Sequence, residues 1–153
     1  MAVVVIDTNV LVAAAGDANT SLNCEFAAYQ FVLRLAQSTD WVAVDHNDAI
    51  LGEYRNNLNQ RANPQSIGFE LYKQLHAEGR FDYQIIEFDP AGHAVLPQNC
   101  QISDLNDRKF VAVALAHPDH PNIYNATDSD WQKDTQKLTA CGVCVIELCN
   151  AKP

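Results

Sequence analysis

The chain contains 153 residues, enough for one domain with its own hydrophobic core. No apolar run approaches the roughly 20 residues that cross a bilayer, and the N-terminus lacks the basic region of an export signal. We therefore expect a single soluble domain over residues 1–153, cytoplasmic and without a membrane partner. Nineteen acidic residues against ten basic ones give a net charge of −9, which excludes binding to a nucleic acid through overall charge alone. A nucleic-acid partner would require local basic patches or help from another protein.

Short apolar runs alternate with amphipathic segments along the chain. Residues 2–6 form a β-branched run typical of a strand buried on both faces. Apolar residues recur every three or four positions over 21–37, which predicts an amphipathic helix whose apolar face carries Leu22, Phe26, Tyr29, Leu33 and Ala36. Further strands are predicted over 41–44, 83–88, 123–126 and 143–148, and further helices over 48–58, 63–78, 108–116 and 129–139, with a loop over 89–102. The helix over 63–78 would begin at Asn63-Pro64, because proline is allowed in a first turn.

Regular alternation of strands and helices predicts a parallel sheet that is covered by helices on both faces. Ligands of such sheets bind outside the carboxyl ends of the strands. Acidic residues that follow the predicted strands are therefore the first candidates for a functional site.

The five cysteines, Cys24, Cys100, Cys141, Cys144 and Cys149, are odd in number and have no secretory context. Cys141 and Cys144 have the CxxC spacing, but they belong to a predicted apolar strand rather than to the strand-to-helix turn of a redox pair. No second CxxC completes a zinc site. We expect buried free thiols.

Four acidic clusters lie at or near the predicted carboxyl edge of the sheet. They are Asp7 after the first strand, Glu53 on helix 48–58, Asp104 with Asp107 before helix 108–116, and Asp128 with Asp130 after strand 123–126. Each cluster alone also has a structural interpretation, since an acid can cap a turn or a helix, or lie on a solvated helix face.

Together, the clusters indicate a metal site. Two carboxylates about 4 Å apart repel one another by about 4 kcal/mol at an effective dielectric near 20, and a bound cation offsets that repulsion. No histidine or cysteine is placed to complete a zinc site, so the all-carboxylate set favours Mg²⁺ or Mn²⁺.

The acidic clusters are embedded in longer motifs. Val4-Val5-Ile6-Asp7-Thr8-Asn9-Val10-Leu11 is similar to the opening signature of PIN domains, and Glu53 after Ala49-Ile50-Leu51 resembles their second acid. Asp104-Leu105-Asn106-Asp107-Arg108-Lys109-Phe110 resembles the third motif, and Thr127-Asp128-Ser129-Asp130-Trp131 the fourth. The motifs span nearly the whole chain in the family's order. This resemblance implies a three-layer α/β/α sandwich, with a central, mostly parallel sheet of about five strands, and metal-dependent endoribonuclease activity.

Carried over residue by residue, the resemblance implies catalytic acids at Asp7, Glu53, Asp107 and Asp128, and a metal held by Asp7, Asp107, Asp128 and Asp130. Thr8 and Asn9 would orient Asp7 by hydrogen bonding, with Asp104 in a supporting role. The fourth motif departs from the family where Ala126 replaces a common threonine, so the division of roles between Asp128 and Asp130 stays open. Arg55, Arg108 and Lys109 adjoin the acids and could contact phosphates, although as surface charges they need no such role.

The resulting hypothesis is an Mg²⁺- or Mn²⁺-dependent ribonuclease. One or two ions held by Asp7, Asp107 and Asp128 would position and deprotonate a water for in-line attack on phosphorus, and Glu53 would hold the water or a second ion. The family includes toxins of toxin–antitoxin pairs and RNA-processing nucleases. The implied partners are therefore an RNA substrate, an antitoxin or other protein, and a second copy of the chain.

Other classes fit less well. A phosphatase of the haloacid dehalogenase type needs a second aspartate two residues after the first, and that position is Asn9. A receiver domain needs paired acids at the end of the first strand, where Asp7 is alone. A catalytically weak PIN-like module that acts through a protein partner remains the alternative, favoured by the acidic surface and disfavoured by the full set of acids. Trp41 and Trp131 are interpreted as core or rim packing.

Overall fold

A central parallel sheet organises the fold in the computed structural model, which describes residues 2–16, 19–61 and 66–149. Its strands follow the order β3-β2-β1-β4-β5, and all neighbours are parallel. The bounds are β1 (Val3–Ile6), β2 (Trp41–Asp45), β3 (Phe81–Gln84), β4 (Ile123–Asn125) and β5 (Val145–Glu147). The expected parallel sheet of about five strands is confirmed.

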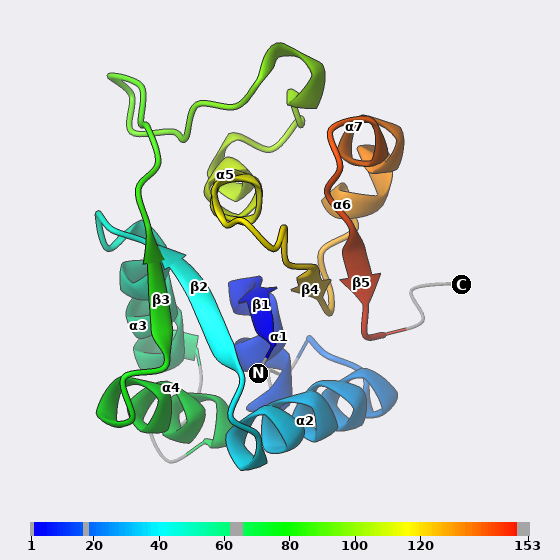
Figure 1. Cartoon of the computed structure of the whole chain (residues 1–153). Coiled ribbons are helices and arrows are strands. Elements are labelled where there is room, and N and C mark those ends of the chain that lie inside the picture. Colours follow the sequence, from blue (N-terminus) through cyan, green and yellow to red (C-terminus); the bar gives the residue numbers. More distant parts are fainter. Residues whose placement is uncertain (1, 17–18, 62–65, 150–153) are drawn as a thin grey trace.

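Helices lie on both faces of the sheet, as the alternation predicted (Figure 1). They are α1 (Thr8–Ala14), α2 (Leu22–Gln37), α3 (Ala49–Arg61), α4 (Ile67–Ala77), α5 (Arg108–Ala116), α6 (Asp130–Lys133) and α7 (Thr135–Ala140), with short 3₁₀ turns η1 (Gln98–Cys100) and η2 (Leu105–Asp107). Helices α1 to α4 pack against one another, whereas α5 crosses β1 and β2. The arrangement is a three-layer α/β/α sandwich. Within the described residues, no helix combines the length and apolar character needed to cross a membrane.

The position of β1 in the middle of the sheet places the candidate site. The chain leaves β1 toward β2 on one side, while β4 pairs with β1 on the other, with Ile6 in register with Tyr124. Strand order therefore reverses between β1 and β4, and ligands of parallel sheets bind in the crevice at such a point. The backbone N–H of Asp7 donates to the carbonyl oxygen of Tyr124 at 3.0 Å, so Asp7 leaves β1 beside the end of β4.

Helix α2 forms where expected, but the prediction of its apolar face is wrong. Leu22 and Phe26 are 82% and 61% exposed, and Tyr29 and Leu33 are also exposed. The buried face is instead Cys24, Ala28, Phe31, Val32 and Leu35, which turn toward α1 and α4. Small side chains at two of these positions allow α2 to approach α1 closely, which leaves an exposed apolar stripe on the opposite side.

Three other segments differ from the prediction. Helix α1 was not expected, and six of its seven residues are buried. Strand β3 ends at Gln84, because its register with β2 runs from Phe81 to Gln84; the apolar residues that follow leave the sheet, with Ile85 84% exposed. The helix predicted over 129–139 is divided into α6 and α7 at Asp134, whose buried carboxylate accepts hydrogen bonds from Ser103.

Helix α4 begins at Ile67, where the Ser66 side chain accepts a hydrogen bond from the backbone N–H of Phe69. The Asn63-Pro64 start predicted for this helix lies outside the described residues.

The expectation of free cysteines is wrong for four of the five, and the fifth, Cys144, is free but not buried as expected. Cys24 pairs with Cys149 and Cys100 with Cys141, across sequence separations of 125 and 41 residues. Cys144 is unpaired but exposed. The Cys24–Cys149 bond joins α2 to the segment after β5, and the Cys100–Cys141 bond forms where η1 packs beside the end of α7. Spacing along the chain does not reveal either proximity.

Candidate metal centre

Asp7 is the buried centre of the site and caps helix α1. Its Oδ1 accepts the backbone N–H of Asn9 at 3.2 Å, and its Oδ2 accepts the indole N–H of Trp131 at 2.6 Å. The residue is only 5% exposed. Burial raises the pKa of the Asp7 carboxyl from 3.8 to about 7; the two hydrogen bonds oppose this rise, and the charges of Asp128 and Glu53 add to it.

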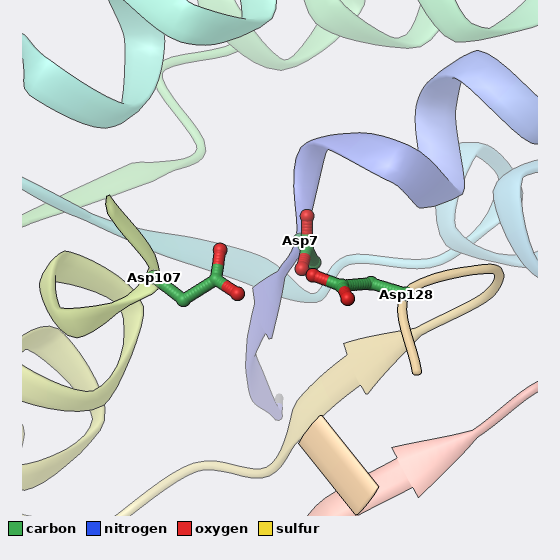
Figure 2. Close-up of side chains that lie close together, drawn as sticks. All are labelled: Asp7, Asp107 and Asp128. Atoms are coloured by element: carbon green, nitrogen blue, oxygen red, sulfur yellow. The ribbon is translucent and has the colours of Figure 1, made fainter. Parts of the chain in front are cut away.

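Two more carboxylates converge on Asp7 (Figure 2). Asp107 comes from the end of η2 at the start of α5, and Asp128 from the loop between β4 and α6. The three residues each offer one carboxylate oxygen, and these oxygens all lie within 4.8 Å of one another. Burial, together with the charges of Asp7 and Asp128, raises the pKa of Asp107 well above its usual range. Ionising all three groups is therefore costly without a compensating cation.

Asp104 and Asp130 lie at the edge of this cluster and form a second group with Asp128 by the same criterion of distance. Both have other partners. Asp104 caps η2, where its Oδ1 accepts the backbone N–H of Asn106 at 2.8 Å. Asp130 pairs with the exposed Lys133 at 2.8 Å and, through its backbone N–H, donates to Asp128 Oδ1 at 2.9 Å. Of the two candidate acids in the fourth motif, Asp128 is the one that approaches Asp7.

Glu53 is near the cluster but has a different set of partners. Its Oε1 pairs with Lys109 Nζ at 2.9 Å, and its Oε2 accepts a hydrogen bond from the Thr8 hydroxyl. The Thr8 side chain thus orients Glu53 rather than Asp7, which corrects the expected role of Thr8. Lys109, on α5, connects the Glu53 carboxylate to the element that carries Asp107.

Asn9 contributes to the site through both its backbone and its side chain. The backbone N–H binds Asp7, as expected, whereas the side-chain amide holds the end of β4 and the loop that follows it. Its Oδ1 accepts the N–H of Ala126 at 2.8 Å, and its Nδ2 donates to Asn125 Oδ1 at 2.9 Å. Asn9 therefore fixes the loop that carries Asp128 against the helix that starts at Asp7.

The two arginines predicted near phosphates have other partners. Arg55 binds the carboxylate of Asp48 and the hydroxyl of Tyr72, on the side of α3 that faces α4. Arg108 donates to the carbonyl oxygen of Ile102 at 3.1 Å. Lys109 is the one of the three predicted phosphate-binding residues whose charged group contacts an acid of the site.

The prediction from sequence missed three residues that hold the site together. Trp131 was expected only to pack, yet its N–H binds Asp7. Asn125, at the end of β4, is buried and donates to Glu147 Oε2 at 2.6 Å and to the Asp128 carbonyl oxygen at 2.8 Å. Glu147 ends β5, and burial and the charge of Asp128 raise its pKa. Glu147 was missed because the last strand was predicted to run to residue 148, which placed this acid inside the strand rather than at its carboxyl end.

The donor set fits a hard divalent cation. All the converging groups are carboxylates, which suit Mg²⁺ or Mn²⁺. Among the described side chains, Lys109 is the only cation paired with Glu53, and no cation is paired with Asp7, Asp107 or Asp128. Comparison of the chain with protein-family models, with curated proteins and with solved structures finds no match. The geometry of the site and its chemistry therefore carry the functional argument.

Proposed function

We propose that this chain is a PIN-like, metal-dependent endoribonuclease that hydrolyses RNA phosphodiester bonds with Mg²⁺ or Mn²⁺ held by Asp7, Asp107 and Asp128. The observation that carries the proposal is the convergence of these three carboxylates around the buried Asp7 at the carboxyl edge of the sheet. Ionised carboxylates gathered in this way repel one another and destabilise the protein unless they hold a cation.

Each residue around the three acids has a distinct role in the proposed reaction. Trp131 and Asn9 fix the two oxygens of Asp7, so the carboxylate is oriented before a cation arrives. Asn9 and Asn125 hold the loop that carries Asp128. Glu53, which is oriented by Thr8 and Lys109, would accept a proton from a water beside the cluster. A bound divalent cation would supply Lewis-acid activation of water and neutralise charge on the phosphate oxygens.

The substrate class follows from the resemblance of the motifs to PIN domains and from the phosphodiester chemistry of an all-carboxylate centre. The net charge of −9 opposes long-range attraction of RNA, so we expect few phosphate contacts and a shallow dependence of affinity on salt. An acidic nuclease of this kind would gain RNA affinity from a partner protein that supplies basic residues. A toxin restrained by an antitoxin is a separate possibility, which the resemblance to PIN domains suggests.

Cleavage of RNA in the presence of Mn²⁺ tests the proposal directly. We expect the wild type to cleave single-stranded RNA, and Asp7→Asn and Asp107→Asn to lose at least about 100-fold in rate while remaining folded. Glu70→Gln is a matched control, because Glu70 is an exposed acid on α4 that pairs with Lys73. Wild-type rates in Asp7→Asn, or equal losses in Glu70→Gln, would end the proposal.

A second candidate function is that of a catalytically weak module acting through a protein partner. The exposed apolar stripe of Leu22, Phe26, Tyr29 and Leu33 on α2 is the observation that favours it, since contiguous exposed apolar side chains commonly mark interaction surfaces. Thermal unfolding with and without millimolar Mn²⁺ separates the two functions. A rise in melting temperature that is lost in Asp7→Asn supports the metal enzyme, and no shift supports the module.

A further inference from the structure

A cavity of about 500 Å³ lies between α6, α7 and β5, beside the metal centre. Its volume is in the range of pockets that bind small organic groups. Trp131 and Glu147 line this cavity, and both also take part in the hydrogen bonds that hold the acids.

Two hydrogen-bond connections join the cavity to the acids. On one side the Trp131 indole N–H reaches Asp7 Oδ2 at 2.6 Å. On the other side Glu147 accepts a hydrogen bond from Asn125, whose amide also donates to the carbonyl oxygen of Asp128. Trp131 therefore contacts a carboxylate of the centre directly, whereas Glu147 is connected to the backbone of Asp128 through one residue, Asn125. A substrate group in the cavity would be close to one at the acids.

The residues that line the cavity indicate what kind of chemical group it would bind. Leu138 and Val143 provide a buried apolar floor, and Thr135 and Thr139 bring hydroxyl oxygens to the wall. The two threonine hydroxyls donate their protons to backbone carbonyls, so their oxygens remain as acceptors.

Charge excludes a phosphate from this cavity. Among the described residues, Glu147 is the only charged one that lines the cavity, and a carboxylate repels a phosphate. A flat, uncharged ring that carries N–H donors matches an apolar floor and walls of acceptors, and a nucleobase is such a ring.

We propose that this cavity is a subsite for one unpaired nucleobase of the RNA, next to the phosphodiester at the metal centre. The inference rests on the proposed ribonuclease function. The base lies against the apolar floor and its exocyclic amino group donates to an acceptor on the wall. Because a base in a duplex is not free to enter, the enzyme cleaves single-stranded RNA in preference to duplex.

Cys144 provides a probe of the cavity. It lines the cavity, is exposed, and is the one cysteine outside the two disulfides. Its alkylation by N-ethylmaleimide can be followed by intact mass, with Ca²⁺ in place of Mn²⁺ to limit cleavage. We expect a saturating single-stranded hexanucleotide RNA to slow alkylation about 10-fold, and the same sequence as a duplex to leave the rate unchanged, since a base in the cavity would cover the Cys144 thiol.

Substitution of a residue in the wall of the cavity provides a second test of the subsite. Thr139 is exposed on α7, so Thr139→Phe narrows the cavity without disturbing the core. We expect it to raise KM for single-stranded RNA about 10-fold, with kcat and Mn²⁺ affinity unchanged. Thr39→Phe, at an exposed position between α2 and β2, is the matched control and should leave KM unchanged.

The outcomes separate this subsite from the proposed function. If the wild type cleaves RNA with Mn²⁺ but RNA gives no protection of Cys144 and Thr139→Phe has a normal KM, the subsite is wrong and the function stands. Equal protection by duplex and single strand would also overturn the subsite. Failure of the wild type to cleave RNA or to bind Mn²⁺ would overturn both.

Discussion

Replacement of Asp7 by asparagine should stabilise the metal-free protein at alkaline pH, even though it removes the central residue of the site. Burial raises the pKa of Asp7 from 3.8 to about 7, so the folded protein holds this proton more tightly than the unfolded chain. The unfolding free energy is thus unaffected by Asp7 below pH 3.8, falls as the pH rises toward 7, and stays low above it. The raised pKa of Asp107 acts in the same direction.

The size of this loss of stability follows from the shift in the pKa of Asp7. About three pKa units at 1.36 kcal/mol each correspond to a loss of about 4 kcal/mol by pH 8. Asparagine avoids this loss and can still accept the Trp131 hydrogen bond. If its amide nitrogen takes the place of Oδ1, it loses the bond from the Asn9 backbone, which costs about 1 kcal/mol. The net gain of about 3 kcal/mol corresponds to a melting temperature about 6–12 °C higher than that of the wild type.

Thermal unfolding in EDTA at pH 5 and pH 8 measures this effect, with Glu70→Gln as the control for loss of one exposed acid. We expect the wild type to be less stable at pH 8 than at pH 5, Asp7→Asn to show a smaller difference, and Mn²⁺ to restore stability only in the wild type. If Asp7→Asn melts below the wild type at pH 8 in EDTA, the reasoning about desolvation of Asp7 is refuted.

Three further predictions concern the surroundings of the site and the scaffold. Trp131→Phe removes the hydrogen bond to the buried carboxylate of Asp7 and should weaken Mn²⁺ binding about 10-fold, as measured by titration. Trp41→Phe is the control and should leave the affinity unchanged. Equal affinities of the two variants would contradict a positioning role for Trp131. Gly68→Ala places a Cβ 2.6 Å from a backbone carbonyl oxygen of α1 and should lower the free energy of unfolding by about 2 kcal/mol, as measured by chemical denaturation. Gly52→Ala is the control: its nearest neighbours lie at 3.7 Å, so the substitution should be neutral or stabilising. Thiol titration of the unfolded, unreduced protein should find one free cysteine, and opening each disulfide should cost about 2–5 kcal/mol; five free thiols would contradict the two disulfides.

The alternation of strands and helices was predictable from local periodicity, apart from α1 and the break between α6 and α7. Which face of each element is buried was less predictable. Helix α2 carries two apolar stripes with helical spacing, and the larger one, from Leu22 to Leu33, is exposed. Its partner α1 was not predicted, since Val10 and Val12 favour strands, and close contact with α1 selects the stripe of small residues through Ala28. Packing against α1 therefore determined which stripe of α2 is buried, and periodicity alone could not predict this.

The acids of the site were predictable for a different reason. Asp7 and Asp128 follow strands and Asp107 precedes a helix, so topology brings them together whatever the details of side-chain packing. The hydrogen bonds around them were not accessible in this way. That Thr8 binds Glu53, and that Trp131 binds Asp7, depends on rotamers and on the approach of α3 and α6 to β1.

Assembly of the site from distant segments also affects when activity can begin. Its carboxylates are residues 7, 107 and 128, and the Trp131 donor follows the last of them. At about 5–20 residues per second, a ribosome takes on the order of 10 s to pass from the first acid to the last. Throughout that interval the nascent chain holds an incomplete set of ligands. If the proposed nuclease function is correct, the chain cannot cut the messenger from which it is being translated before Asp128 has been added.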